Sequence, residues 1–136
     1  MAKLKKQHMT IHWKAIVQDD SSIPATEATL KEKATLVGRI GLMMLSVGTG
    51  AWRVRNSMNK VARCLGITCT ADIGLLAISY TCIEGTDTYT QSISNPTTGV
   101  NTHKLMQLEL FMKEFPDKVS TYSVKHIHEV LDEIQK

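Results

Sequence analysis

The fold of this chain is decided by one stretch, Thr29-Leu-Lys-Glu-Lys-Ala-Thr-Leu-Val-Gly-Arg-Ile-Gly-Leu-Met-Met-Leu-Ser-Val-Gly-Thr-Gly50, which continues as Ala51-Trp-Arg-Val-Arg-Asn-Ser-Met-Asn-Lys-Val-Ala-Arg-Cys-Leu-Gly66. Thr29 and Glu32 form a capping box, in which each side chain satisfies a free backbone donor at a helix start. Apolar residues then recur at helical spacing. They are Leu30, Ala34, Val37, Ile40, Met44 and Leu45. The stretch therefore predicts a helix that begins at Thr29.

A second helix is predicted directly after the first. Gly48 ends the first helix, because glycine adopts the left-handed C-terminal position at little cost, and Gly66 ends the second in the same way. The apolar face of the second helix consists of Ala51, Val54, Met58, Val61 and Leu65. The turn Gly48-Thr49-Gly50 thus joins two helices in a hairpin or corner.

Two glycines lie inside the first helix, on or near its apolar stripe. Glycine in a helix interior costs about 1 kcal/mol relative to alanine, so its presence usually has a packing reason. Gly38 and Gly41 therefore predict the close approach of a neighbouring helix or sheet.

Beyond Gly66 the period changes from helical to extended. Strands are predicted over 67–71, 74–83 and 88–94, because these segments are rich in β-branched and hydroxyl residues and the last alternates as a partly exposed strand. The turn 84–87 separates the second strand from the third, and 95–99 closes the group. The three segments form an antiparallel meander.

Two more helices complete the chain. Asn101 is placed to cap the first and Pro116 to end it, and Ser120, Thr121 or Ser123 is placed to start the second. Their apolar faces are Leu105, Leu108, Phe111, Met112 and Phe115, and then Val124, Ile127, Val130, Leu131 and Ile134. The predicted order is α-α-β-β-β-α-α, an α+β domain with helices packed on one sheet face.

The composition fits one globular domain. The chain has 136 residues, 43% of them apolar, and a formal charge of +3. We expect residues 1–24 to form a peripheral segment or linker, and residues 25–136 to form the domain.

No signal peptide is visible. The longest apolar stretch, 40–47, is far shorter than the roughly 20 residues of a membrane span. The cysteines at 64, 69 and 82 lack a chelating spacing, so reduced thiols in a cytosolic domain are expected.

The glycine turn is the candidate ligand site. Gly48, Thr49 and Gly50 present free backbone N–H groups at a helix start with Arg53 one turn in, and this arrangement can hold an anion. It is also what any tight helix corner requires, and it lacks the pattern of a P-loop. Asp72, between two predicted strands, is either a turn former or a functional carboxylate.

Catalytic and metal-binding patterns are weak. His126 and His128 are two residues apart on a helix, so they point to different sides and do not chelate one ion together. Cys82, His103 and Asp72 are each present singly, and no Ser/His/Asp or Cys/His arrangement can be identified. We therefore expect no metal, no cofactor and no enzymatic activity.

A small nucleic-acid-binding domain is the alternative from another class. Two helices with a glycine turn, a basic second helix and a β-hairpin resemble a winged helix. Arg53, Arg55, Lys60 and Arg63 would then contact phosphates, although they do not share one helical stripe. No polar base-reading set is clustered at the helix start, so nucleic acid is not the expected partner.

The segments 36–55 and 58–66 resemble the N-terminal cytoplasmic domain of the threonine/serine exporter family. That domain has a helix ending in glycine and small residues, then Arg-Val and usually a glutamate, and then an amphipathic helix closing on Ala-x-x-Leu-Gly. The resemblance covers about residues 30–135, including Gly99-Val-Asn101 and Glu129-Val-Leu-Asp-Glu-Ile134. The positions that match its most specific block are Gly48, Gly50, Arg53, Val54, Ala62, Leu65 and Gly66.

One residue departs from the family pattern. Arg55 stands where the family commonly has an acid, so a role that depends on a carboxylate at this position does not transfer to this chain.

The resemblance implies a place in a membrane transporter. In the family this domain precedes transmembrane helices that export small hydroxy amino acids. It therefore implies a gating, ligand-sensing or assembly module on the cytoplasmic face of a bacterial cell membrane. Its partner would be a transmembrane domain in the same full-length chain or in a separate membrane subunit, and self-association as a homo-oligomer is left open. Membrane spans are expected beyond Lys136 or in a neighbouring gene.

Overall fold

The structure, a computed structural model, describes residues 23–74, 77–94 and 101–135. The elements are η2 (Ala25–Glu27), α2 (Leu30–Ser46), α3 (Ala51–Cys64), β1 (Thr68–Ile73), β2 (Ala77–Glu84), β3 (Asp87–Ser94), α4 (Thr102–Lys118) and α5 (Val124–Gln135). The predicted α+β class and the order of two helices, three strands and two helices are confirmed. The predicted loop 95–99, and the predicted peripheral segment apart from Ile23 and Pro24, lie outside the described residues.

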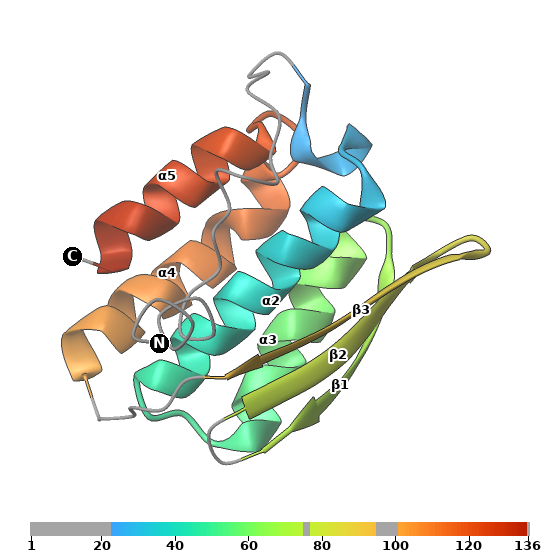
Figure 1. Cartoon of the computed structure of the whole chain (residues 1–136). Coiled ribbons are helices and arrows are strands. Elements are labelled where there is room, and N and C mark those ends of the chain that lie inside the picture. The colour runs from blue at the N-terminus through green and yellow to red at the C-terminus, as the bar shows by residue number, and fades with distance from the viewer. Residues whose placement is uncertain (1–22, 75–76, 95–100, 136) are drawn as a thin grey trace, which may run out of the picture.

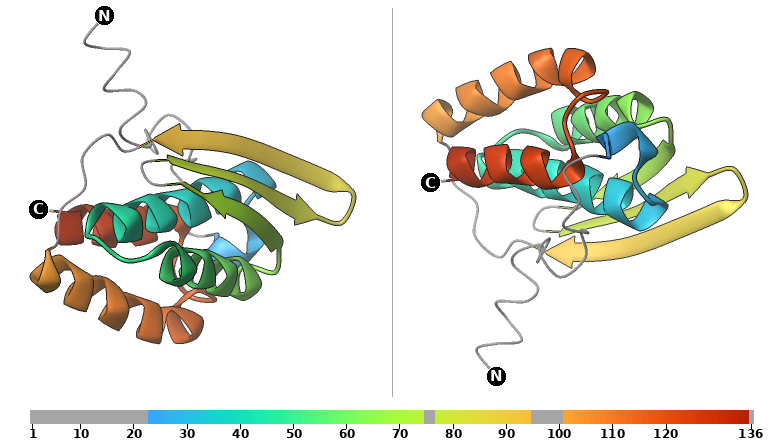
Figure 2. Two further views of the ribbon diagram at one scale, coloured as in Figure 1. Left: turned by 90° about the horizontal axis from the view of Figure 1, so that it is seen from below. Right: turned by 90° about the horizontal axis from the view of Figure 1, so that it is seen from above.

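The elements form three layers (Figures 1 and 2). The antiparallel sheet, in the order β1-β2-β3, has α2 and α3 packed on one face. The second helical pair lies beyond the first, with α5 against α2 and α4 against α3. The helix α2 contacts α3, β2, β3 and α5, so it occupies the centre of the domain.

The central position makes α2 more buried than a single apolar stripe would predict. Every residue from Glu32 to Leu45 is buried, including the charged Lys33 and Arg39.

The capping box that begins this helix is present in a modified form. The Glu32 backbone N–H donates to Thr29 Oγ1 at 3.2 Å, and the Thr29 hydroxyl donates to Glu32 Oε1 at 3.0 Å. The local sequence therefore predicts the start of α2 correctly, but it does not predict the burial of the charged residues of this helix.

Both glycine helix ends have the predicted left-handed geometry. Gly48 has φ 94° and Gly66 has φ 78°. After α2, Thr49 N–H donates to Met44 O and Gly48 N–H donates to Leu45 O. The same pair of bonds follows α3, where Ile67 donates to Ala62 and Gly66 to Arg63. These pairs are Schellman motifs, which satisfy the last carbonyls of each helix.

The interior glycines of α2 admit neighbours as predicted. A Cβ atom on Gly38 would lie 2.1 Å from the hydroxyl oxygen of Tyr80 on β2, and one on Gly41 would lie 2.5 Å from the sulfur of Met58 on α3. The Tyr80 hydroxyl donates to the Ala34 carbonyl at 2.8 Å. The missing side chain of Gly38 thus allows the sheet to pack closely against α2, and that of Gly41 allows α3 to do so.

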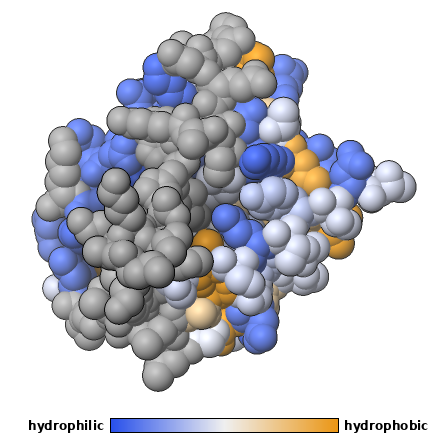
Figure 3. Space-filling view, in the orientation of Figure 1, coloured by the Kyte–Doolittle hydropathy of each residue, from blue (hydrophilic) through white to orange (hydrophobic). Residues whose placement is uncertain are grey.

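The sheet has one apolar face and one polar face. Cys69 pairs with Cys82, Ala71 with Tyr80 and Ile73 with Ile78, and these side chains face the helices. The opposite face carries hydroxyl groups that bond across strands, Ser79 to Ser92 at 3.0 Å and Thr81 to Thr90 at 2.9 Å. In Figure 3 much of the surface over the strands has the pale colour of weakly polar residues.

Several predicted boundaries were wrong. The first strand extends to Ile73, and Gly74 lies outside the second, since its N–H donates to Ala77 O in the connection between the two strands. Pro116 does not end α4, which continues to Lys118; a proline in the last turn removes one hydrogen bond without preventing the final residues from being helical. Ala51 is exposed because it lies in the first turn of α3, before the helix packs against its neighbours.

The predicted helix caps are present. Asn101 Oδ1 accepts from Lys104 N–H at 3.0 Å at the start of α4. Of the three candidates for α5, Ser123 acts as the cap, since its hydroxyl accepts from His126 N–H at 3.1 Å. No helix in the described ranges combines the length and the apolar character that crossing a membrane requires.

Replacing Gly48 by valine should destabilise the fold by about 2–3 kcal/mol, because a β-branched side chain is forced to positive φ. The matched control is Gly50→Val, at φ −72° with no atom within 4 Å of an added Cβ. The control should cost about 1 kcal/mol or less, the loss of a favourable N-cap residue. Urea midpoints measure both, and equal midpoints would contradict the role of Gly48.

Gly38→Ala should be more costly than Gly41→Ala. The alanine methyl at 38 meets the rigid phenol of Tyr80, whereas the methyl at 41 meets the flexible side chain of Met58. Overpacking typically costs about 1–3 kcal/mol, and a flexible neighbour reduces it. Chemical denaturation of the two variants side by side checks this order, and a larger loss for Gly41→Ala would refute it.

Candidate functional site

The helix corner that was predicted as the ligand site borders an open hollow of about 430 Å³. The hollow lies where α2 ends, α3 begins and β1 ends. Its lining residues are Leu45, Gly48, Thr49, Gly50, Ala51, Ile73 and Gly74. The structure therefore brings the end of the first strand to the glycine corner.

Some polar groups of the corner form hydrogen bonds within the fold, and others have no partner among the described residues. The Thr49 hydroxyl donates to Met44 O at 2.8 Å and so closes the end of α2. The Gly50 carbonyl accepts from Arg53 and Val54, but no side chain caps the start of α3. Among the described residues, the backbone N–H groups of Ala51 and Trp52 have no hydrogen-bond partner. These are the groups that a helix start offers to an anion.

The other two candidate residues do not line the hollow. Arg53 points to α4, where its guanidinium donates to Glu109 and forms an ion pair between half-exposed side chains. Asp72 is exposed on β1, on the face of the sheet that carries the hydroxyl groups. The geometry thus groups Gly48, Thr49 and Gly50, and it leaves Arg53 and Asp72 outside that group.

A buried polar cluster around Arg39 was not identified from sequence. Arg39 Nη1 donates to the His128 carbonyl at 3.0 Å and lies 3.1 Å from His128 Nδ1. Its Nη2 donates to Gln135 Oε1 at 2.7 Å and pairs with the Asp132 carboxylate. Arg39 thus fixes α5 to the middle of α2. Two features of the sequence could have indicated this cluster. His128, Asp132 and Gln135 are spaced to lie on one face of the last helix, and Arg39 is a single arginine within an apolar run.

The two histidines have different environments, as their spacing predicted. His126 is exposed and makes an edge contact with the Tyr122 ring, with centroids 4.4 Å apart. His128 is fully buried. Burial and the adjacent Arg39 charge lower the pKa of His128 to about 3, against a smaller opposing effect of Asp132. The buried imidazole is therefore neutral at physiological pH.

Two other buried groups have shifted pKa values for structural reasons. The hydrogen bond that the Cys82 thiol donates to Cys69, together with burial, raises the pKa of Cys82, and burial raises the pKa of Tyr80. All three cysteines are free thiols in the structure. The ammonium group of buried Lys33 is paired with Glu84 on β2 at 2.7 Å. Tyr80 and Lys33 thus connect the sheet to α2.

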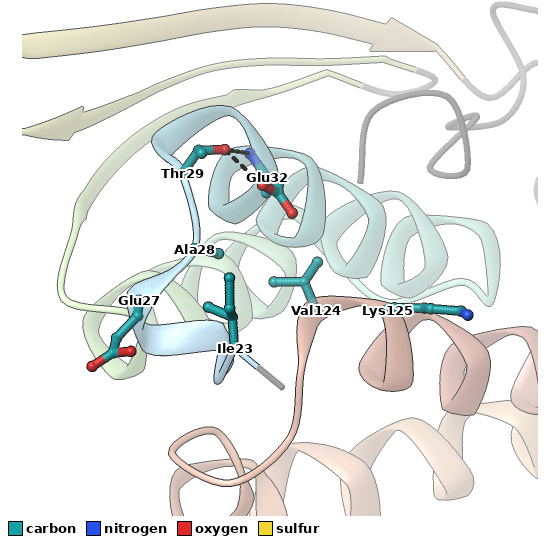
Figure 4. A pocket seen from close by; sticks show the side chains of 7 residues that line it. All are labelled: Ile23, Glu27, Ala28, Thr29, Glu32, Val124 and Lys125. Carbon is teal, nitrogen blue, oxygen red and sulfur yellow. Dashed lines mark hydrogen bonds between the residues drawn. The ribbon is translucent and has the colours of Figure 1, made fainter. Parts of the chain in front are cut away.

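Two smaller pockets offer less chemistry. One, of about 60 Å³, lies between Ile23, the start of α2 and Val124 (Figure 4). Two of its four polar side chains, Thr29 and Glu32, already bond each other; the other two are Glu27 and Lys125. The other, of about 90 Å³, lies between α4 and α5 and is lined mainly by aromatic and aliphatic side chains. Within the described ranges no group of three or more metal-binding side chains occurs.

Comparison with protein families now defines the class. Residues 35–136, from the first turns of α2 onward, match the model of the family described as "Putative threonine/serine exporter" (ThrE). The match covers more than half of the chain, so the chain belongs to the threonine/serine exporter family. The description of the family is that of a transporter. Searches of curated proteins and of solved structures found no match.

The stability of the domain should fall with acid through His128. Its pKa is lower in the folded chain, about 3, than the unfolded value of about 6.5, so the unfolded chain binds more protons between these values. The contribution of the neutral His128 imidazole to the free energy of unfolding is fully present above pH 6.5. Below this pH the free energy of unfolding falls by about 1.4 kcal/mol per pH unit. Urea unfolding between pH 7 and about pH 4.5 measures this loss.

Two variants isolate the effect. His128→Gln should be less stable at pH 7 but should show a shallower slope below pH 6.5. His126→Gln changes an exposed residue of the same helix and should keep the wild-type slope. An unchanged slope in His128→Gln would show that the buried imidazole is not responsible.

Proposed function

We propose that this chain is the cytoplasmic module of a threonine/serine exporter, and that it senses the amino acid and acts on a membrane-spanning partner. The family match over 35–136 is the observation that carries the proposal. The partner is a transmembrane domain, either in the same full-length chain or in a separate subunit. The module sits on the cytoplasmic side of the membrane and catalyses no reaction.

The hollow at the glycine corner is the proposed sensing site. An amino acid carries a carboxylate, and the N–H groups of Ala51 and Trp52, which have no partner among the described residues, are suited to an anion. Gly48, Thr49 and Gly50 leave the backbone open to a small ligand, because two of the three positions have no side chain. Arg53 and Asp72 act only indirectly in this proposal, since both lie outside the hollow.

The nucleic-acid alternative gains no support from the geometry. Arg53, one of its four candidate phosphate contacts, is already paired with Glu109. One face of α3, including Val54, Met58 and Val61, is buried against the rest of the domain. Neither observation favours a groove-binding helix, and the family match favours transport.

Efflux of labelled threonine from cells tests the proposed function. Deletion of this chain from its native locus should reduce threonine efflux to the background rate, and expression of the wild-type chain should restore it. Leucine efflux serves as the control and should not change. Threonine efflux that is unaffected by the deletion would refute the proposal.

A matched pair of variants then tests the sensing site. Gly50→Val adds a side chain at the rim of the hollow and should shift the threonine concentration needed for half-maximal efflux. Thr70→Val lies on the exposed face of β1, away from the lining residues, and should behave as wild type. Equal concentration dependence in both variants would exclude sensing at this hollow.

A further inference from the structure

The outward face of α3 combines an exposed tryptophan with cations. Trp52, Arg55, Asn59 and Arg63 follow one another at spacings of three, four and four residues, which places them on one face of the helix. Trp52 is 72% exposed, and Arg55 and Arg63 are exposed as well. The opposite face, with Val54, Met58 and Val61, packs into the core. The stripe from Trp52 to Arg63 extends over roughly 16 Å.

Among the residues that the structure describes, no acidic side chain neutralises the charge of this face. The sequence has no acidic residue from Lys33 to Ala71, although it has several cations there. Of the α3 cations, Arg53 is paired with Glu109. In the described part of the chain, Arg55, Lys60 and Arg63 form no ion pair. The face therefore keeps a local positive charge that a partner can neutralise.

An exposed tryptophan beside arginines suits the surface of an anionic membrane. The indole has an apolar body and one N–H donor, so it is stable at the level of lipid headgroups. Each cation near an anionic lipid surface adds to binding, and the attraction decreases with salt. Arginine and asparagine side chains also read base edges in a DNA groove, whereas an exposed indole is not a base-reading side chain. Trp52 therefore favours the membrane surface over a DNA groove.

We propose that the outward face of α3, defined by Trp52, Arg55 and Arg63, lies against the anionic headgroup surface of the membrane. The indole inserts at headgroup level and the guanidinium groups bind lipid phosphates. This inference rests on the proposed function, because it defines how the module is oriented beside the exporter. The first strand and the hollow then lie close to the membrane surface, since the hollow includes Ala51, the neighbour of Trp52.

Purified chain and protein-free vesicles test the proposal. Vesicles of phosphatidylglycerol mixed with phosphatidylcholine should bind the chain at about 0.1 M salt, and vesicles of phosphatidylcholine alone should not. In a Trp13→Phe background Trp52 is the remaining tryptophan, and its fluorescence should shift to shorter wavelength on the anionic vesicles.

Paired variants locate the binding face. Each cation contributes about fivefold to the partitioning, so Arg55→Gln with Arg63→Gln should weaken binding about thirtyfold. Lys31→Gln with Lys113→Gln removes the same charge from exposed positions elsewhere that form no ion pair among the described residues, and it should weaken binding far less. Circular dichroism and urea midpoints confirm that both double variants are folded.

Three results of the vesicle experiments would overturn the proposal. They are equal binding to both kinds of vesicle, an unchanged Trp52 emission, and equal losses in the two double variants. Tighter binding to a DNA duplex through Arg55 and Arg63 would also overturn it, in favour of a nucleic-acid surface. Because the vesicles contain no exporter, failure here leaves the efflux test unaffected, and dependence of threonine efflux on the chain would still support the proposed function.

Discussion

The interaction on which the rest of the structure depends is the buried charge of Arg39. An arginine in the middle of a fully buried helix has to be paired, because an uncompensated charge in the interior costs several kcal/mol. Four groups from α5 supply the compensation: the backbone carbonyl and ring of His128, the carboxylate of Asp132 and the amide of Gln135. The last helix therefore supplies the partners that the buried Arg39 of α2 needs.

The same constraint explains the layered architecture. α2 can be central only if a neighbour approaches it closely on each side. Gly38 admits Tyr80 from the sheet, and Gly41 admits Met58 from α3. Lys33, the other buried cation of the helix, is paired with Glu84 on β2. Each neighbour of α2, whether the sheet, α3 or α5, therefore meets either a glycine, where its side chain can approach closely, or a buried cation that it pairs.

The proposed sensing site and the proposed membrane-facing surface lie where this packing ends. The glycine corner turns the chain away from the central helix, and the hollow beside it is bounded by backbone rather than by large side chains. α3 packs its apolar face inward, so its arginines and Trp52 project outward. A domain with a buried centre, an open corner and a basic outer face fits the proposed module, which receives a small ligand at the corner and lies against the membrane with its basic face.

The sequence by itself determined the elements whose cause is local. Thr29 with Glu32, Asn101 and Ser123 each act within one helical turn, and Gly48 and Gly66 act through their own backbone angles, so these signals predicted helix ends correctly. The alternation of the strands and the period of the helices predicted the class and the order. Residue identities within the glycine corner also indicated the family. Each of these features is visible over a few residues of sequence.

Only the tertiary structure decided which distant groups meet. Arg39 and Asp132 are 93 residues apart, and Lys33 and Glu84 are 51 apart. No local pattern connects such residues, because the contact exists only after the layers assemble. For the same reason the sequence grouped Arg53 and Asp72 with the glycine corner, whereas packing directed Arg53 to Glu109 and placed Asp72 on the outer face of the sheet. Side-chain partners are set by the assembled layers, and helix ends are set by the chain within one turn.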